Sequence, residues 1–405
     1  MWTRESRAPV GVFSMSGAIL VLNSGSSSIK FGLYALTGKS DPNLLCKGLL
    51  DEHDATPRLT IKDVSGNVVF DQPRHRDDNG NRVLLTGLLE WIDAYLTGDR
   101  LLAIGHRVVH GGRDFVTPVE VTDAILDALF ALTPLAPMHQ PSGLSPIRTL
   151  RSLRPGLRQI ACFDTAYHRR LAPPVNRYAL PRRYEAIGIH RYGFHGLSYE
   201  FIAGCLPEIS PALASKRTVV AHLGSGSSLC AMRQGTSVDT TMGLTPLDGL
   251  MMATRCGAID PGVLLYLQQG LGMSVGDIEH LLYNKSGLLG VSELSGDMRV
   301  LLASADPRAA EAIDLFCLYA AREVTVMANA LGGLECLVFT GGIGEHSIKV
   351  RQKICDRLQW LGVQLDMVAN DRGNQRISKE NSPVEIRIIP TNEEIMIARH
   401  CLEML

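Results

Sequence analysis

The chain has 405 residues, of which 45% are apolar and 20% charged, and its formal net charge is −1. This length predicts two domains, and the balanced charge gives no electrostatic reason to bind nucleic acid or a membrane surface. Nine scattered cysteines without CxxC pairs, and no apolar run of the ~18 residues that a membrane helix needs, indicate a cytoplasmic protein with buried free thiols.

Two short strands are expected near the beginning of the chain, after a lead-in, residues 1–17, that we expect to be disordered. The apolar runs 18–22 and 29–36 are typical of strands, and the polar stretch NSGSSS joins them. A Gly/Ser stretch is often a solvated linker. A tight turn between buried strands, by contrast, gathers N–H groups and hydroxyls that can bind an anion. These residues alone leave both interpretations open.

Three polar segments follow where a protein core would be apolar, namely GHRVVHGG (105–112), CFDTAYH (162–168) and HRYGFHG (190–196). Each places one chemically useful side chain among small residues: Arg107, Asp164 and His195. We expect His106 and His110 to brace the loop around Arg107.

The stretch VVAHLGSGSSLCAM (219–232) repeats the layout of the first two strands and their turn. Ser27, Ser28 and Ile29 fall on Ser227, Ser228 and Leu229, an offset of 200. An internal repeat half a chain apart predicts two related α/β domains. A long segment dense in small residues (239–262) comes next and carries Arg255, and Asp239 at its start is typical of a turn-capping residue.

A long helix, a strand and a glycine loop are expected in the last third of the chain. Asp306 and Pro307 predict the beginning of a helix over 306–331. The run CLVFT (336–340) and the loop GGIGEHS (341–347) follow it, a layout typical of nucleotide sites. Finally, TNEEIMIARH (391–400) predicts a helix with Thr391 and Glu394 as a capping box.

None of the glycine loops matches GxxxxGK[ST] or a GxGxxG after a strand. A phosphate site here would therefore be of the hairpin type, with two turns facing each other across a cleft between two similar domains. That arrangement belongs to the actin-like ATPase and sugar-kinase superfamily. The quoted segments, in their order from about Ile19 to the C-terminus, resemble the acetokinase family.

The resemblance implies a duplicated actin-like ATPase (RNase H-like) α/β fold with the active site in the cleft. It implies an N-terminal domain of residues 18–168 plus 391–405 and a C-terminal domain of residues 169–390. The implied reaction is the reversible ATP-dependent phosphorylation of acetate to acetyl phosphate and ADP, with Mg²⁺ or Mn²⁺. A homodimer, without nucleic acid or membrane partners, is implied as well.

The resemblance also assigns roles to individual residues. Arg107 matches the residue that binds the substrate carboxylate, and the catalytic positions around the transferred phosphoryl group match Asp164, His195 and Arg255. The remaining matches are the apolar pocket Val109, Phe194 and Pro246; the first phosphate loop Asn23, Ser26, Ser28 and Lys30; the second phosphate loop His222, Leu223, Gly224, Ser225 and Gly226; the adenosine site Asp297, Met298, Arg299, Gly341, Gly342, Ile343, Gly344 and Glu345; and the metal-site residues Asn23 and Glu393.

Some positions depart from the family pattern. Ser225 replaces an Asn in the second phosphate loop, and the usual GTSH after the catalytic His is here Gly-Leu-Ser-Tyr, residues 196–199. Ala258 stands where an Asp is usual, and Met138 where a pocket Leu is common. These changes concern substrate preference and nucleotide affinity more than the reaction.

The chemistry fits these residue types. A carboxylate is already ionised at pH 7, so Asp164 has no proton to remove, and we assign it to the water shell of the metal. Propionate is an alternative substrate, because one extra methylene changes binding by only ~1–3 kcal/mol. A sugar kinase is disfavoured by Arg107. A non-enzymatic ATP-binding clamp would not need Arg107, His195 and Arg255.

Overall fold

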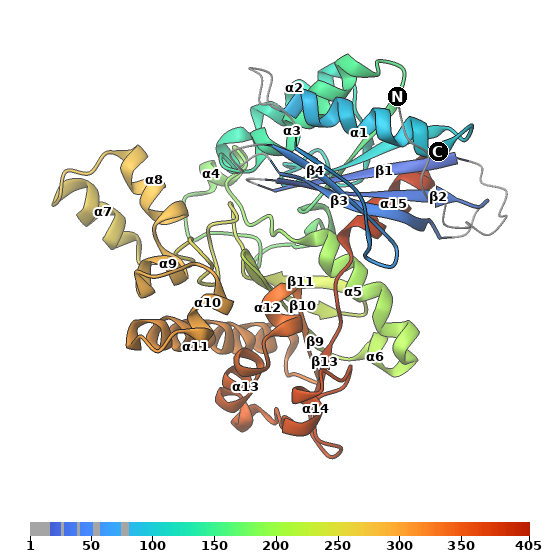
Figure 1. The fold of residues 1–405 in the computed structure, drawn as a ribbon. Helices are drawn as coiled ribbons and strands as arrows, with labels where there is room; N and C mark the ends of the chain where they lie inside the picture. The colour runs from blue at the N-terminus through green and yellow to red at the C-terminus, as the bar shows by residue number, and fades with distance from the viewer. Residues whose placement is uncertain (1–16, 26–27, 39–40, 52–56, 74–80) are drawn as a thin grey trace. The chain divides into compact units, whose positions relative to one another are not determined.

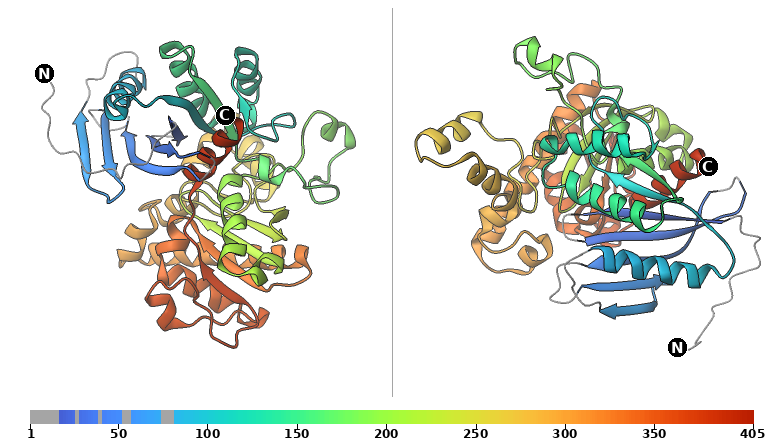
Figure 2. Two further views of the ribbon diagram at one scale, coloured as in Figure 1. Left: turned by 90° about the vertical axis from the view of Figure 1, so that its right-hand side faces the viewer. Right: turned by 90° about the horizontal axis from the view of Figure 1, so that it is seen from above.

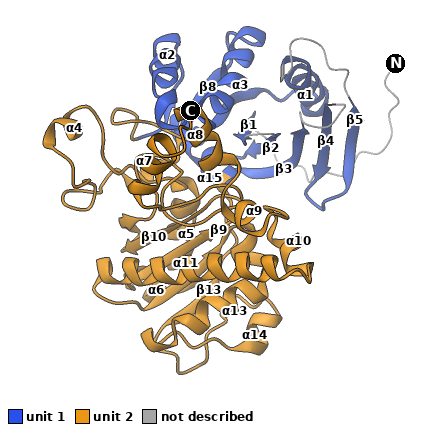
Figure 3. Cartoon of the chain, turned by 90° about the vertical axis from the view of Figure 1, so that its left-hand side faces the viewer, with its two compact units in different colours: residues 1–108, 117–162, 394–405 blue, residues 109–116, 163–393 orange. Residues whose placement is uncertain are grey.

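The computed structural model describes residues 17–25, 28–38, 41–51, 57–73 and 81–405. The predicted lead-in, except Gly17, and the predicted phosphate-loop residue Ser26 lie outside these ranges. The chain divides into two compact units, residues 1–108, 117–162 and 394–405 in unit 1 and residues 109–116 and 163–393 in unit 2 (Figure 3). Each unit is described by itself.

Unit 1 is built on an eight-stranded sheet of order β5-β4-β3-β2-β1-β6-β8-β7. Helices α1 and α3 cover one face, where Leu88 and Leu150 join a cluster with Leu20 and Ile104 of the central strands. Helix α15 packs against Gly105, which leaves no room for a side chain there. The elements are β1 Gly17–Ser24, β2 Ser28–Leu36, β3 Asn43–Asp51, β4 Arg58–Asp63, β5 Val68–Pro73, α1 Asn81–Leu96, β6 Leu101–Val108, β7 Val119–Glu120, α2 Asp123–Ala131, a 3-10 turn Thr133–Leu135, α3 Gln140–Leu153, β8 Arg158–Phe163 and α15 Glu393–Met404.

Unit 2 contains a five-stranded sheet of order β11-β10-β9-β12-β13 between two helical layers (Figure 1). The long helix α11 packs on one face against Val219 and Ala221, and α5 packs on the other face against Val220 and Cys230. The elements are a 3-10 turn Ala166–His168, α4 Arg182–Ala186, α5 Gly196–Ile209, α6 Pro211–Ser215, β9 Thr218–Leu223, β10 Ser227–Arg233, β11 Thr236–Thr240, α7 Pro261–Gln269, α8 Val275–Asn284, α9 Gly287–Ser292, α10 Met298–Ala303, α11 Pro307–Leu331, β12 Cys336–Thr340, α12 Gly341–His346, α13 Ile348–Arg357, a 3-10 turn Gln359–Leu361, α14 Met367–Asp371 and β13 Glu385–Ile388.

The two sheets repeat one topology, which confirms the predicted duplication and the α/β fold class. In unit 1, β1 pairs antiparallel with β2 and parallel with β6. In unit 2, β9 pairs antiparallel with β10 and parallel with β12. The predicted phosphate turns, β1–β2 and β9–β10, therefore occupy the same place in each sheet.

The residue correspondence within the repeat differs from the predicted offset. Ile29 pairs with Ser24 in the first hairpin, and Ser227 pairs with Leu223 in the second. Ile29 thus corresponds to Ser227 rather than to Leu229, a shift of two residues. Because side chains alternate with a period of two along a strand, this shift preserves the apolar pattern and is hidden in the sequence.

The predicted helix at 306–331 is confirmed, because Asp306 accepts a hydrogen bond from the Arg308 N–H and α11 ends at Gly332 in the left-handed conformation. The prediction of a glycine loop at 341–347 is wrong, because Gly341–His346 form the short helix α12. The carboxylate of Glu345 accepts a hydrogen bond from the Gly341 N–H at 2.9 Å and thereby closes its first turn.

The predicted capping box at the last helix is wrong. Helix α15 begins at Glu393. The Thr391 hydroxyl donates to Ser198 Oγ at 2.8 Å, and Glu394 Oε1 accepts from Asn23 Nδ2 at 3.2 Å. Both side chains bond to distant residues of their own unit, and these partners outcompete the local cap.

All nine cysteines are free, and seven of them are buried, as expected. In the part of the chain that the structure describes, we find no helix whose length and apolar character would suit it to cross a membrane.

Candidate active site

The turn between β9 and β10 gathers the predicted catalytic residues of unit 2. The Gly224 N–H donates to the Gly226 carbonyl at 3.0 Å and closes the turn. A methyl group at Gly226 would lie 3.2 Å from Arg255 Nη2 and 3.3 Å from His195 Nε2. Arg255 and His195 therefore both lie against the turn that the sequence analysis named as the second phosphate loop.

Arg255 is held in place by the irregular segment that precedes α7. Its Nη1 donates to the Pro246 carbonyl at 2.7 Å. Two residues earlier, the Ala253 N–H donates to the Ser225 carbonyl at 3.1 Å and ties the segment to the turn. The guanidinium of Arg255 therefore lies beside the turn, and the backbone segment that carries Arg255 is hydrogen-bonded to the same turn.

His195 adopts a left-handed backbone conformation, with φ 57° and ψ 26°, immediately before α5. This conformation costs a non-glycine residue on the order of 1–3 kcal/mol and concentrates at functional sites. The following Gly196 N–H donates to the Asp164 carbonyl at 2.9 Å, and a methyl group at Gly196 would lie 2.1 Å from that oxygen. Only glycine allows this approach, which places buried Asp164 next to the start of α5.

Two further histidines lie around His195. The ring of His222, the first residue of the second phosphate loop, stacks on the His195 ring with centroids 4.3 Å apart. Behind them His168, which is fully buried, bonds through Nε2 to the Phe194 carbonyl at 3.0 Å. Burial lowers the pKa of His168 from 6.5 to about 4. Sequence reasoning missed His168, although it ends the quoted segment CFDTAYH.

The predicted adenosine residues of α12 lie beside the second phosphate turn. Gly341, with φ 75°, leaves no room for a side chain against the Leu223 backbone. A methyl group at Gly224 would lie 4.0 Å from the Gly342 N–H. The second phosphate loop and the N-terminus of α12 are therefore neighbours, and Ile343 and Gly344 continue the same helix.

Buried Arg351 on α13 supports α12 from behind and was missed by sequence reasoning. Its Nη1 donates to the Gly344 carbonyl at 2.9 Å and to the Glu345 carbonyl at 2.8 Å. Its Nε donates to Asn370 Oδ1 at 2.7 Å. Burial lowers the pKa of Arg351 from its ordinary value. A charged residue in a basic, polar stretch such as IKVRQK gives no sequence signal that it is buried.

The other predicted adenosine residues form the N-terminus of α10. Asp297 caps this helix by accepting from the Arg299 N–H at 2.8 Å, and Met298 is buried. The Arg299 guanidinium pairs with the same carboxylate, which lowers the pKa of Asp297 to about 2. Gly296 packs against the Ala253 carbonyl, so α10 begins next to the segment that is bonded to the turn.

Unit 1 brings together a different set around the turn between β1 and β2. Asn23 lies opposite Lys30 in the hairpin. Arg107 Nη1 donates to Asn23 Oδ1 at 3.3 Å, and Asn23 Nδ2 donates to Glu394 at 3.2 Å. Ser28, the first residue of β2, accepts through its carbonyl from the Gly25 N–H at 2.8 Å. Sequence reasoning treated Glu394 only as a helix cap and missed its bond to Asn23.

The predicted apolar pocket residues all belong to unit 2. Val109 and Phe194 are buried, and the ring of His110, next to Val109, meets the Phe194 ring edge-on at 5.4 Å. Pro246 is linked to Arg255 by the bond described above. Phe194 therefore lies close to the residue that follows Val109 in the chain, and Pro246 is bonded to Arg255.

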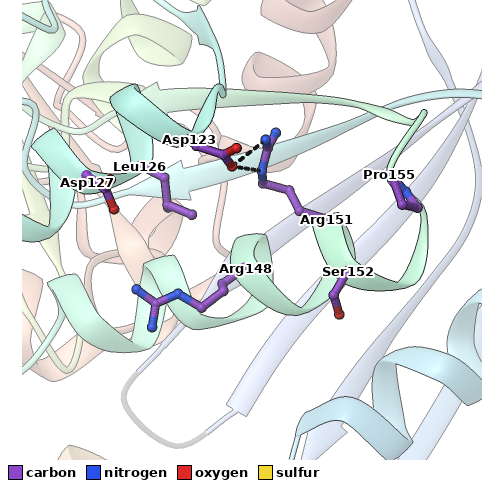
Figure 4. A pocket seen from close by; sticks show the side chains of 7 residues that line it. All are labelled: Asp123, Leu126, Asp127, Arg148, Arg151, Ser152 and Pro155. Atoms are coloured by element: carbon purple, nitrogen blue, oxygen red, sulfur yellow. Dashed lines mark hydrogen bonds and ion pairs between the residues drawn. The ribbon is translucent and has the colours of Figure 1, made fainter.

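A surface hollow in unit 1, between α2 and α3, is unrelated to these residues (Figure 4). Arg151 in its wall is bonded to Asp123 Oδ1 at 2.6 Å and to the Val121 carbonyl at 2.6 Å. None of the predicted site residues lines this hollow.

Among the described residues, no group of three or more His, Cys, Asp or Glu side chains is arranged to hold a metal ion. The oxygen donors on the predicted metal residues, the Asn23 amide and the Glu393 carboxylate, are nevertheless of the type that Mg²⁺ prefers. Mg²⁺ commonly takes one or two protein carboxylates and completes its shell with waters and substrate phosphates. The donor chemistry of these residues therefore fits such a metal.

Comparisons with known proteins identify the family of the chain. The model of the acetokinase family matches residues 18–399. The chain is 51% identical over 392 residues to the acetate kinase of Rhodopseudomonas palustris (strain TIE-1), covering 95% of this chain and 98% of the relative. A propionate kinase structure from Francisella tularensis superposes with a TM-score of 0.86 at 35% identity, covering 95% of this chain and 98% of that one. The Porphyromonas gingivalis acetate kinase structure gives a TM-score of 0.81 at 34% identity, with 94% and 98% covered. The chain belongs to the acetokinase family.

Proposed function

We propose that the protein catalyses reversible transfer of the γ-phosphoryl group of ATP to acetate, giving acetyl phosphate and ADP. The observation that supports this proposal best is the placement of Arg255 and His195 against Gly226 of the second phosphate turn. In a member of the acetokinase family, these side chains are suited to contact the phosphoryl group during transfer.

The main obstacle to this reaction is electrostatic. At 4 Å, two unit negative charges repel by roughly 4 kcal/mol at an effective dielectric constant of 20. Positive side chains reduce this repulsion, and phosphoryl transfer by enzymes depends mostly on positioning and charge stabilisation. We assign Arg107 to the acetate carboxylate, Lys30 to the ATP phosphates and Arg255 to the equatorial oxygens of the transferred group.

The transfer needs no general base. An acetate oxygen forms the new bond to the γ-phosphorus while the bond to the β–γ bridging oxygen breaks, and ADP leaves with that electron pair. Because acetate is already ionised at neutral pH, Asp164 removes no proton. His195 donates a hydrogen bond to the transferred group.

Mg²⁺, or Mn²⁺ in its place, would neutralise phosphate charge when bound. Asn23 and Glu393 would hold the ion, and Asp164 would orient its water shell. The adenosine part of ATP would lie along the N-termini of α10 and α12, at Asp297–Arg299 and Gly341–Glu345.

Propionate is the second candidate substrate, because a structural relative with a TM-score of 0.86 is a propionate kinase. Val109, Phe194 and Pro246 would form the wall against the acyl group. An apolar wall discriminates poorly against one extra methylene, by about 1–3 kcal/mol. The ratio of kcat/KM values for the two acids decides between them.

We also propose a homodimer in the cytoplasm. Helix α7 buries none of its residues and exposes Val263, Leu265 and Tyr266, and it extends with α8 away from the sheet of unit 2 (Figures 1 and 2). No charged residue lies between Asp260 and Asp277. The exposed apolar side chains of α7 are therefore suited to pack against the same helix of a second copy of the chain. The buried free thiols support a reducing compartment. Light scattering of the purified protein tests the dimer.

The reaction is tested by mixing the protein with Mg·ATP, acetate and hydroxylamine, which converts acetyl phosphate to a coloured hydroxamate. We expect hydroxamate in proportion to ADP. If ADP forms without hydroxamate, the protein is an ATPase. If neither ADP nor hydroxamate forms, the protein binds ATP without acting as a kinase. Replacing acetate by propionate and butyrate in the same assay ranks the acids.

A further inference from the structure

The two stacked histidines of unit 2 are each bonded to a buried serine through ring Nδ1. His195 Nδ1 lies 2.8 Å from Ser228 Oγ, and His222 Nδ1 lies 2.8 Å from Ser198 Oγ. Both serines are fully buried. Each histidine is bonded to the serine near the other histidine: Ser198 is on α5, which begins immediately after His195, and Ser228 lies opposite His222 in the β9–β10 hairpin.

Each serine is bonded in turn to a second hydroxyl. Ser228 Oγ lies 2.5 Å from the hydroxyl of Tyr199, and the Thr391 hydroxyl donates to Ser198 Oγ at 2.8 Å. Two relays result, Tyr199–Ser228–His195 and Thr391–Ser198–His222. Each relay runs from the hydroxyl of a tyrosine or threonine through a serine hydroxyl to an imidazole ring.

The hydrogen of Tyr199 determines the direction of the first relay. Tyr199 is fully buried, and burial raises its pKa well above 10, so the phenol keeps its hydrogen. Within the described part of the chain, its hydroxyl has Ser228 Oγ as its hydrogen-bond partner. The phenol therefore donates to Ser228, and the single hydrogen of Ser228 is left for His195 Nδ1.

The second relay has the same direction. Thr391 donates to Ser198, so the single hydrogen of Ser198 is left for His222 Nδ1. In both rings Nδ1 then accepts, and a neutral imidazole that accepts at Nδ1 carries its hydrogen on Nε2. The two Nε2 atoms lie on the side of the second phosphate turn, 3.3 Å from a methyl group at Gly226 for His195 and 3.9 Å from one at Gly224 for His222.

We propose that Tyr199 and Ser228 are positioning residues that hold His195 in the neutral Nε2–H tautomer, with Thr391 and Ser198 doing the same for His222. His195 then presents a hydrogen to the phosphate turn without adding a second positive charge beside Arg255. The catalytic value of this arrangement rests on the proposed function, whereas the tautomer itself does not.

The neutral form also suits the geometry of the pair. Two imidazolium rings with centroids 4.3 Å apart would repel each other and would face the Arg255 guanidinium. A protonated His195 would need Ser228 to accept from Nδ1, and the hydrogen of Ser228 or of Tyr199 would then have no acceptor. The relay therefore disfavours the charged ring and the reversed tautomer together.

Tyr199 is one of the positions where the chain departs from the acetokinase pattern, in which GTSH ends in a histidine. A histidine there can itself gain or lose a proton near neutral pH. Tyr199 cannot, so in this chain the relay keeps one direction over the whole neutral range.

The tautomer is measured by long-range ¹H–¹⁵N spectra of the full chain labelled with ¹⁵N-histidine, without substrates. The His195 signals are assigned from their loss in His195→Asn. We expect a bare Nδ1 and a protonated Nε2 for His195 in the wild type. In Tyr199→Phe, the hydroxyl of Ser228 no longer accepts from the phenol and can accept from His195 Nδ1 instead. We therefore expect a mixture of the two tautomers of His195, one of which carries its hydrogen on Nδ1.

The kinetic consequence is a fall of about 3–10-fold in kcat for Tyr199→Phe, with KM for ATP and for the acid within two-fold of the wild type. Tyr167→Phe is the matched control. Tyr167 is a partly buried neighbour whose ring centroid lies 6.4 Å from that of Tyr199, and its hydroxyl donates to the Gly235 carbonyl at 2.8 Å, outside the relay. We expect the control to keep the wild-type tautomer and kcat.

A wild-type His195 with hydrogen on Nδ1 overturns the proposal, as does a Tyr199→Phe protein whose spectrum and kcat equal those of Tyr167→Phe. If Tyr199→Phe does not fold, Ser228→Ala is measured in its place, and an unchanged His195 tautomer overturns the proposal there too. An inactive wild type with the expected tautomer would refute the proposed reaction and leave the tautomer assignment standing.

Discussion

The two hairpin turns occupy the same place in their sheets and carry opposite kinds of chemistry. Around the β1–β2 turn of unit 1, charged and amide groups bond directly to one another, as Arg107, Asn23 and Glu394 do. Around the β9–β10 turn of unit 2, neutral rings and hydroxyls form relays, with Arg255 beside them. A duplicated fold thus fixes where a turn stands and leaves the function of each copy to the side chains around it.

The largest effect is expected from Arg255 in unit 2. If this side chain acts on the transition state, Arg255→Ala should lower kcat by about 10²–10⁴ with little change in either KM. Arg255→Lys should recover little, because a point charge does not reproduce the planar fork of the guanidinium. A near-normal kcat in Arg255→Ala would remove the catalytic role assigned to unit 2.

Stability should respond to acid through buried histidines in both units. Burial lowers the pKa of His106 in unit 1 to about 3 and that of His168 in unit 2 to about 4. The unfolded chain binds protons near pH 6.5 and the folded chain does not, so stability is present above pH 6.5 and is lost as the pH falls toward 4. For His168 the loss is about 3 kcal/mol over that range.

Urea unfolding at pH 7.5 and pH 5.0 measures the part of this loss that occurs above pH 5. In His168→Asn, the free energy of unfolding should change less between these two pH values, by roughly the contribution of one histidine, because Asn does not titrate. An equally steep dependence in His168→Asn would show that its neutral form is not required by the fold.

Arg107 should reveal the different role of unit 1. Losing a charge-assisted hydrogen bond to a carboxylate costs about 1.5–3 kcal/mol, so Arg107→Ala should raise KM for acetate about 10–100-fold. KM for ATP should stay within a few-fold. Initial-rate kinetics with each substrate varied separately gives both values, and equal losses for the two substrates contradict the assignment.

The smallest effect is expected at Ser28, the first residue of β2. Ser28→Ala removes a hydroxyl from the first phosphate turn and keeps the backbone bond from Gly25 to its carbonyl. The loss of a neutral hydrogen bond, about 1 kcal/mol, should raise KM for ATP about 5-fold without lowering the melting temperature. A lower melting temperature with unchanged KM would make Ser28 a structural residue instead.

The sequence by itself determined the features that depend on neighbours in the chain. The apolar runs around each Gly/Ser turn predicted two hairpins, and Asp306 with Pro307 predicted where α11 begins. Motifs at fixed spacing identified the family and suggested a catalytic set, of which the structure places Arg255 and His195 at one turn. Alternation, capping and motif spacing are local, so they can be recognised without knowing the fold.

Only the tertiary structure decided the partners that lie far apart along the chain. Thr391 bonds to Ser198 and Asn23 bonds to Glu394, and these bonds replaced the local cap predicted for α15. The two-residue shift in the repeat was invisible because it preserves the alternation of side chains. The left-handed backbone of His195, the burial of Arg351 and the direction of the hydroxyl relays depend on the same cause. Each is fixed by which strands and helices the sheet brings together, and no short window of sequence contains both partners.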